Sequence, residues 1–101
     1  MKALLITPDT QSIEVVHING LGDIIKLIGY ESVTSDEIGP GGDRLYFDEE
    51  CFLRGSSGRF QIDTVIPVSG IGVIVGTEDE GATFKDVVSD VESIERRLKY
   101  L

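Results

Sequence analysis

The sequence has few of the residues that most often carry enzyme chemistry. It holds no tryptophan, one methionine, one cysteine and one histidine in 101 residues. A lone cysteine excludes an internal disulfide, so we expect a reducing, cytoplasmic compartment rather than the disulfide framework of a secreted domain. His17 falls inside a strand pattern, and Cys51 follows Glu49 and Glu50, whose negative charges disfavour the reactive thiolate. We therefore predict no catalytic residue and no cofactor.

Positive charge is also scarce, and long apolar runs are missing. Nine basic residues stand against 18 acidic ones, which gives a formal net charge of −9. This charge repels nucleic acid and anionic membrane surfaces, so we expect no direct nucleic acid binding and no membrane binding. The apolar run at 3–6 is too short for a signal peptide, and no stretch reaches the roughly 20 residues of a membrane span. These absences predict a soluble cytoplasmic protein.

What is present fits a single domain, 1–101, with one core. Apolar runs at 3–6 and 12–18 flank a Pro-Asp turn and predict a hairpin. Asn19 is then expected to cap a short helix from Gly20 to Ile28 that stops at Gly29. The remaining short strands are predicted at 32–34, 44–47, 60–62, 65–68 and 71–75, the last a central strand closely covered on one side because glycines alternate along 70–76.

The C-terminal segment has the most regular pattern. Residues 83–86 have the form of a capping box, and apolar residues follow at alternating spacings of four and three: Val87, Val91, Ile94, Leu98 and Leu101. This predicts an amphipathic helix of about five turns. Packing on the sheet is the simpler role for its apolar stripe, and a seam with a partner helix is the alternative. The predicted fold class is α+β, a mainly antiparallel sheet of about five to seven short strands with one short helix and this helix packed on it.

The middle of the chain places arginine beside glycine-rich turns. Arg54 and Arg59 bracket residues 55–58, whose backbone N–H groups can form an anion-binding nest, and Arg44 precedes them. Guanidinium groups bind phosphate through charge-assisted hydrogen bonds, and aromatic rings let a base stack. A solvated hairpin loop that neutralises the adjacent acidic run is the alternative. The predicted ligand-binding residues are Arg44, Arg54, Gly55, Ser56, Ser57, Gly58, Arg59, Tyr46 and Phe60.

Carboxylates gather at residues 48–50 and 78–80. Their spacing matches no calcium loop, which needs ligands at alternate positions around a glycine, so we predict no metal site. A metal-dependent hydrolase that uses Asp43, Asp48 or Glu49 stays open, because residues distant in sequence can converge in space.

Several segments together carry a resemblance to known sequences. They are Met1-Lys2-Ala3-Leu4, Gly41-Gly42-Asp43-Arg44-Leu45-Tyr46-Phe47-Asp48-Glu49-Glu50, Gly70-Ile71-Gly72-Val73-Ile74-Val75-Gly76-Thr77 and Glu80-Gly81. With them the chain resembles a family of small proteins of unknown function found in phages, plasmids and bacterial chromosomes. The resemblance assigns no catalytic residue. It implies a mobile-element accessory protein, a kind that often serves in counter-defence or host takeover.

The predicted function is that of a non-enzymatic small binding protein of phage or plasmid type that sequesters a nucleotide-like signal. The alternatives are an acidic protein-binding inhibitor or DNA mimic, motivated by the charge of −9, and the metal-dependent hydrolase. The expected partners are a phosphate-bearing small molecule or a host protein. A homodimer is also expected, because glycine-rich strands and a regular helical stripe offer self-complementary surfaces.

Overall fold

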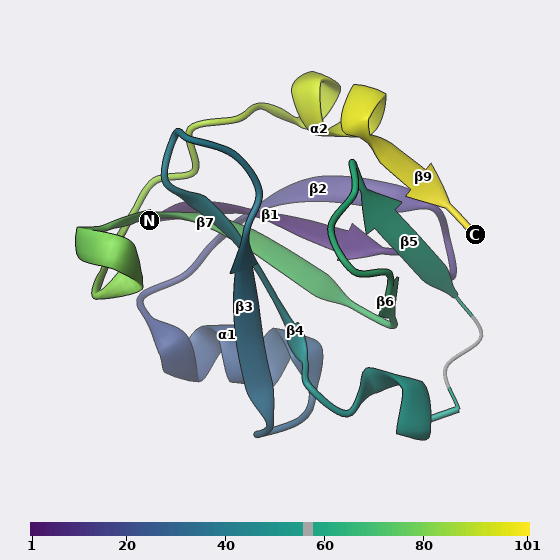
Figure 1. Cartoon of the computed structure of the whole chain (residues 1–101). Helices are drawn as coiled ribbons and strands as arrows, with labels where there is room; N and C mark the ends of the chain where they lie inside the picture. The colour runs from purple at the N-terminus through teal and green to yellow at the C-terminus, as the bar shows by residue number, and fades with distance from the viewer. Residues whose placement is uncertain (56–57) are drawn as a thin grey trace.

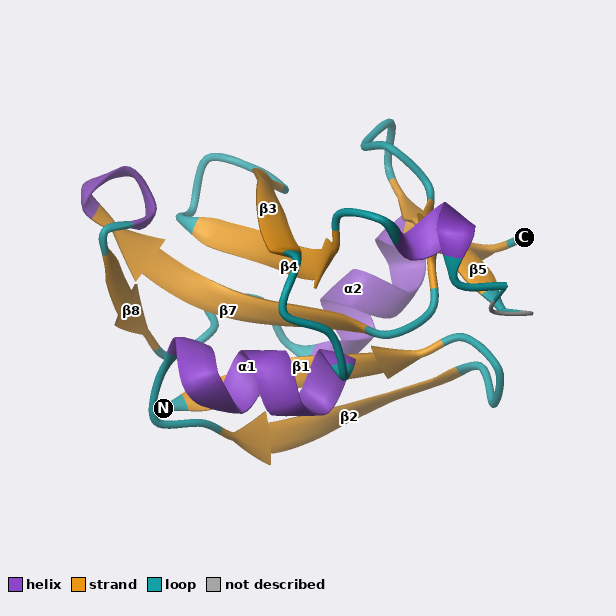
Figure 2. Ribbon diagram, turned by 90° about the horizontal axis from the view of Figure 1, so that it is seen from below, coloured by secondary structure: helices purple, strands orange, loops and turns teal. Residues whose placement is uncertain are grey.

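An N-terminal hairpin and a buried central strand organise the structure, a computed structural model that describes residues 1–55 and 58–101 apart from the side chain of Glu80. The larger sheet has the order β2-β1-β7-β4-β3 (Figure 1). The strand β8 pairs with the end of β7, next to the part of β7 that pairs with β1 (Figure 2). All pairings of the larger sheet are antiparallel. Its strands are β1 (Lys2–Thr7), β2 (Ser12–His17), β3 (Val33–Glu37), β4 (Asp43–Asp48), β7 (Gly72–Glu78) and β8 (Thr83–Lys85).

A smaller antiparallel sheet has the order β6-β5-β9. It contains β5 (Arg59–Ile62), β6 (Val68–Ser69) and β9 (Leu98–Tyr100), and two 3-10 helices, η1 (Cys51–Leu53) and η2 (Asp79–Gly81), follow β4 and β7. The strand predicted at 65–68 is thus mostly wrong, because the Val65 N–H closes a turn on the Ile62 carbonyl. The predicted α+β class with a mainly antiparallel sheet is confirmed.

The helices lie on opposite faces of the larger sheet. Side chains alternate along each strand, so Ala3 and Val75 face α1 (Leu21–Ile28), while Leu4 and Ile74 face α2 (Val91–Arg97) and the smaller sheet. Figure 1 and Figure 2 show the larger sheet between the two helices. The result is a three-layer arrangement with one apolar core on each side of the sheet.

The short helix α1 ends where the sequence predicts. Gly29 has φ 91° and its N–H donates to the Ile25 carbonyl at 2.8 Å, the αL cap that glycine permits. The predicted Asn19 cap is wrong, because Gly20 holds the capping position and the Asn19 N–H donates to the Asp23 carboxylate at 2.8 Å. Among the described helices, none is long and apolar enough to cross a membrane.

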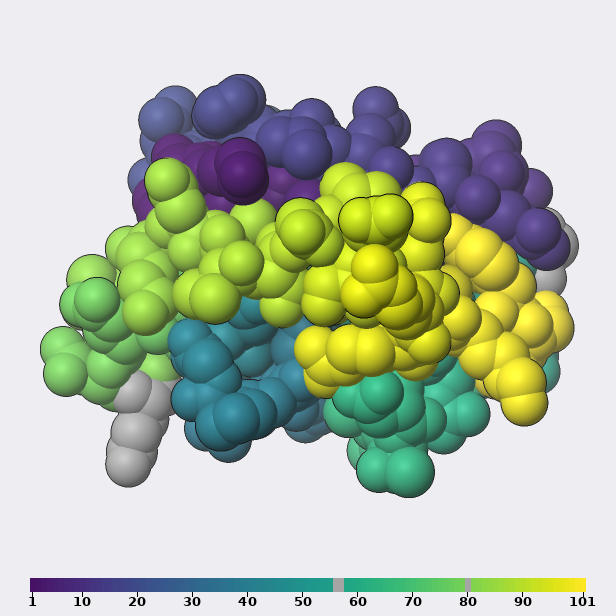
Figure 3. Space-filling view, turned by 90° about the horizontal axis from the view of Figure 1, so that it is seen from above, coloured from purple at the N-terminus to yellow at the C-terminus, as the bar shows by residue number. Residues whose placement is uncertain are grey.

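The C-terminal helix is much shorter than predicted. The Thr83–Lys85 segment pairs with β7, and the Asp86 carboxylate accepts the Lys2 N–H at 2.8 Å, so the expected capping box does not form. The helix begins after Asp90, whose side chain accepts the Ser93 N–H at 2.7 Å. The local spacing did not reveal this because Thr83–Lys85 folds back on β7 as a hairpin, and the Asp86 carboxylate bonds Lys2 at the far end of the chain. Figure 3 shows this segment running across one face, beside the N-terminal hairpin.

Two glycines let other elements pack directly against β7. A Cβ atom on Gly72 would lie 2.6 Å from the ring of Phe60, and a Cβ atom on Gly76 would collide with the Asp86 carbonyl. The predicted central, closely covered strand is confirmed, because β7 pairs with both β1 and β4. The glycines therefore bring the smaller sheet and the segment before α2 into contact with the larger sheet.

We predict that Ile94→Asp unfolds much of the protein. Ile94 is fully buried, and an unpaired carboxylate in its place should lower the free energy of unfolding by about 3 kcal/mol or more. Val88→Asp is the matched control, because Val88 is 62% exposed. Denaturant unfolding followed by circular dichroism measures both. Equal midpoints for the two variants would contradict the packing of α2 on the core.

Candidate functional site

The Asp48 carboxylate at the end of β4 organises the candidate site. It is buried and accepts hydrogen bonds from the Ser32 hydroxyl at 2.5 Å, the Glu50 N–H at 3.1 Å and the Arg54 Nε at 2.9 Å. Arg54 also reaches the Ser32 hydroxyl at 3.3 Å and the Glu50 carboxylate at 3.2 Å. These bonds connect β4, the start of β3 and the residues on both sides of η1.

Opposing effects act on the pKa of Asp48. Burial alone would raise this pKa, but hydrogen bonds from Arg54, Ser32 and the Glu50 N–H favour the ionised form and lower it below its ordinary value. The hydrogen bond to Asp48 in turn raises the pKa of Arg54. The ion pair is therefore charged at neutral pH and fixes the direction of the Arg54 side chain.

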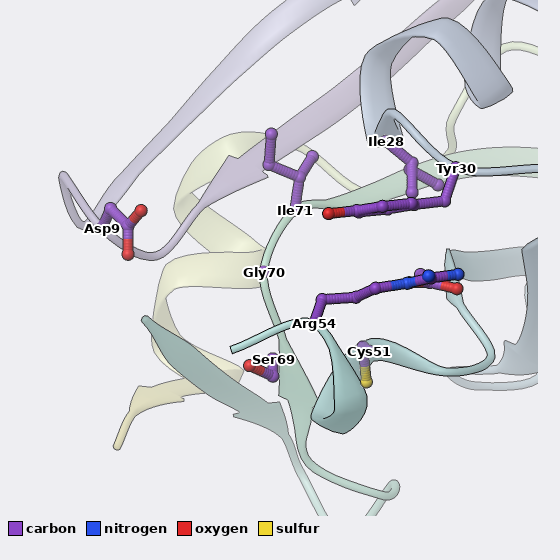
Figure 4. A pocket seen from close by; sticks show the side chains of 9 residues that line it. Asp9, Ile28, Tyr30, Cys51, Arg54, Ser69, Gly70 and Ile71 are labelled. Atoms are coloured by element: carbon purple, nitrogen blue, oxygen red, sulfur yellow. The ribbon is translucent and has the colours of Figure 1, made fainter. Parts of the chain in front are cut away.

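A cation–π stack extends this network to α1. The guanidinium of Arg54 lies over the ring of Tyr30, 4.2 Å from its centroid, and Tyr30 follows Gly29 at the end of the helix. Figure 4 shows the two side chains running parallel, with the Tyr30 hydroxyl end beside Ile71. One face of the guanidinium is thus covered by the ring.

A small pocket of about 210 Å³ opens beside this stack. The charges in its wall are two carboxylates, Asp9 and Asp48, and one guanidinium, Arg54, which already binds carboxylates. An anion entering the pocket would therefore meet little free positive charge. The lining residues are Asp9, Ile28, Tyr30, Asp48, Cys51, Arg54, Ser69, Gly70 and Ile71.

Exposed apolar side chains stand next to the pocket on η1. Leu53 is 81% exposed and Phe52 50% exposed, whereas Cys51 is buried and anchors the helix to the core. The exposed Arg59 places its guanidinium 5.4 Å from the centroid of the Phe52 ring. We call Tyr30, Phe52, Leu53, Arg54 and Arg59 the η1 surface.

The structure separates the three arginines that the sequence grouped. Arg44 lies at the other end of β4 from Asp48, roughly 13 Å along the strand. There it donates to the Ser35 hydroxyl at 3.0 Å and the Ser35 carbonyl at 3.3 Å, and it pairs with Glu37 at 3.4 Å. Arg54 and Arg59 both belong to the η1 surface, but each guanidinium stacks on a different ring.

The two aromatic residues predicted as ligand-binding, Tyr46 and Phe60, lie in the core. Phe60 is fully buried beneath Gly72, and Tyr46 is 7% exposed with its ring edge-on to Phe84 at 5.7 Å. Neither ring presents a face on which a base could stack. The exposed rings beside the arginines are instead Tyr30 and Phe52.

The predicted anion loop is only partly described. Ser56 and Ser57 lie outside the described residues. Gly55 has a positive φ of 74°, and a Cβ atom on Gly58 would lie 2.5 Å from the Asp9 carboxylate. Gly58 is therefore needed where the loop approaches the β1–β2 turn, and a carboxylate lies at this point.

Of the three carboxylates considered for a hydrolase, Asp43 and Asp48 are used in folding, and the side chain of Glu49 is exposed. Both oxygens of Asp43 accept N–H groups, from Val88 and from Ser89, each at 2.9 Å, and Asp48 is paired as described. Among the described side chains, no three or more His, Cys, Asp or Glu residues converge as metal ligands. Asp43 and Asp48 hold the chain in place, and nothing in their geometry favours hydrolysis.

We predict that Asp48→Asn lowers the free energy of unfolding by about 1 to 3 kcal/mol at neutral pH. Because the folded-state pKa of Asp48 is lowered, this stability is present above the unfolded pKa near 4 and is lost as pH falls through the folded pKa. The difference between wild type and variant should therefore shrink below about pH 4. Glu50→Gln, at a half-exposed carboxylate, is the control and should have a small effect. A difference independent of pH in urea titrations would contradict the ion-pair assignment.

Comparison with known protein families, with curated proteins and with solved structures finds no match. The side chains that form the candidate site are Tyr30, Ser32, Asp48, Glu50 and Arg54. Two of them, Tyr30 and Ser32, were missed in the sequence because they lie far along the chain from Arg54. The sequence places Phe52 among the rings available for stacking, and its exposure agrees with that, whereas nothing in the sequence marks Leu53 as exposed, because an isolated leucine gives no sign of its surroundings.

Proposed function

We propose that the protein is a non-enzymatic binding protein that docks the η1 surface onto another protein. The observation that carries this proposal is the exposure of Leu53, 81%, beside the half-exposed ring of Phe52. Adjacent large apolar side chains held in water on a rigid turn are costly, and such groups commonly mark interaction sites.

Hydrogen bonds and burial hold the backbone of η1 in place. Cys51 is buried at the base of η1, the Leu53 N–H donates to the Glu50 carbonyl at 2.9 Å, and Arg54 is tied to Asp48. A preordered surface loses less conformational entropy on binding than a mobile one. The η1 surface also contains Tyr, Phe and Arg, which are residue types enriched at the centres of protein interfaces.

The partner that fits is a protein with an apolar cleft and basic residues around it. Phe52 and Leu53 would fill the cleft, because these two side chains project from the surface. The net charge of −9 attracts a basic partner from a distance and raises the association rate. An apolar centre within an acidic molecule distinguishes this proposal from DNA mimicry, which needs carboxylates at the contact. Docking through η1 agrees with the expected role of a mobile-element protein that acts on a host protein.

Sequestration of a nucleotide-like ligand is the second candidate, and one observation favours it. Among the described ion pairs none includes Arg59, which lies over the Phe52 ring. Arg54 is less suited to phosphate, because Asp48 and Glu50 already bind it. This candidate predicts that Arg59→Ala removes any thermal stabilisation by nucleotides.

We predict that Leu53→Glu weakens partner binding about 30-fold without unfolding the protein. Wild type, Leu53→Glu and the control Leu101→Glu, whose site is 59% exposed, would each be immobilised and incubated with bacterial lysate. A protein retained by wild type and control but lost by Leu53→Glu would then be purified and titrated by calorimetry. We expect about 30-fold weaker binding for Leu53→Glu, as for loss of an interface hot spot of about 2 kcal/mol.

Two results separate the candidates. Equal binding of the purified partner to wild type and Leu53→Glu would contradict docking through η1. A nucleotide that stabilises wild type but not Arg59→Ala in a thermal-shift screen, with no such protein partner, would favour the second candidate.

A further inference from the structure

The two edges of the larger sheet are treated differently. β2 forms one edge and β3 the other, and each has one neighbour in the sheet among the described strands. An open edge presents unpaired N–H and C=O groups to any other chain, so proteins either block it or use it. The side chains beside each edge show whether that edge is blocked or left open for pairing.

The β3 edge is blocked by Arg44. The Ile38 N–H donates to Asp43 and the Glu49 N–H to Ser32, so the alternate residue Ser35 turns its backbone groups away from β4. Arg44 reaches around this edge and donates to the Ser35 carbonyl at 3.3 Å. Asp36 and Glu37 add negative charge, which opposes pairing with a second such strand.

At the β2 edge, no side chain of the described residues donates a hydrogen bond to an outward carbonyl in this way. Ile18 and Met1 exchange both backbone hydrogen bonds, so Val16 and Glu14 also bond to β1, and the alternate residues turn away from it. The outward residues are Ile13, Val15 and His17. Lys2, opposite His17, confirms the alternation, because it bonds Asp86 and Val87 on the far side of β1. Val15 is also 48% exposed.

We propose that β2 pairs antiparallel with β2 of a second copy of this chain about a two-fold axis at Val15. In this register Val15 faces Val15 of the second copy, Ile13 faces His17, and all outward N–H and C=O groups find partners. A register centred on Glu14 would place two like charges directly opposite each other, which is unfavourable. The two larger sheets would join into one continuous sheet.

The charges beside the edge are complementary in the same register. Glu14 would lie opposite Val16 of the second copy, and Val16 lines a groove of about 280 Å³ between β2 and α1 that also contains Lys26. Both Glu14 and Lys26 are exposed, and neither belongs to an ion pair among the described residues. Asp23 also lines the groove, but its carboxylate accepts the Asn19 N–H. The two-fold axis therefore brings each Glu14 towards the Lys26 of the other copy.

Val15→Pro is the direct test, because the Val15 N–H points away from β1 and its loss leaves the hairpin bonds in place. Sedimentation equilibrium from micromolar to millimolar protein should give twice the chain mass of 11.0 kDa for wild type and the chain mass for Val15→Pro. Circular dichroism checks that the variant is folded. Val15→Thr is the control and should still dimerise, because it keeps the N–H and the β-branched shape.

A charge exchange keeps the proposal testable if Val15→Pro fails to fold. Glu14→Lys and Lys26→Glu should each raise the dimer dissociation constant about tenfold, and the double variant should restore it. A wild type that stays monomeric to millimolar concentration would overturn the proposal. So would a folded Val15→Pro that dimerises as wild type does, or a double variant no tighter than the single ones.

Discussion

The ionised Asp48 carboxylate is the interaction on which the candidate site depends. It lies at the end of β4, where the sheet stops and the chain must turn into η1. This carboxylate accepts hydrogen bonds from Ser32, Glu50 and Arg54, and so connects β4 and the residue before β3 to that turn. The Arg54 guanidinium in turn lies over the ring of Tyr30. The exposed pair Phe52 and Leu53 stands on this support. The hydrogen bonds of Asp48 therefore support an exposed apolar surface on an acidic protein.

Two arginines have separate roles at the two ends of β4. Arg44 closes the β3 edge at one end, and Arg54 supports η1 at the other. The closed edge, the η1 surface and the open β2 edge are then three separate parts of the molecule. A dimer through β2 would leave η1 free, so two η1 surfaces would act together and increase avidity for a partner with repeated sites.

Much of the fold was predictable from the sequence, and little of the site was. The hairpin, the end of α1 at Gly29 and the central covered strand were all recognised, because each depends on neighbouring residues or on glycine spacing. The helix from Thr83 failed because pairing with β7 overrides a local capping pattern. The predicted arginine cluster does not form, because β4 is an extended strand. It places Arg44 near one end and the turn with Arg54 and Arg59 beyond the other. Tyr30 carried no signal at all.

Hydrogen exchange of the η1 backbone amides measures how firmly Asp48 holds η1 in place. The Leu53 N–H bonds to Glu50 and the Arg54 N–H to Cys51, so both report on this turn. Asp63→Asn is the matched control, because Asp63 pairs with Arg97 elsewhere in the molecule. We expect Asp48→Asn to accelerate exchange at these two amides about tenfold more than the control does, because the free energy of local opening would fall by about 1.4 kcal/mol. Equal exchange at Leu53 and Arg54 in both variants would contradict this role of Asp48.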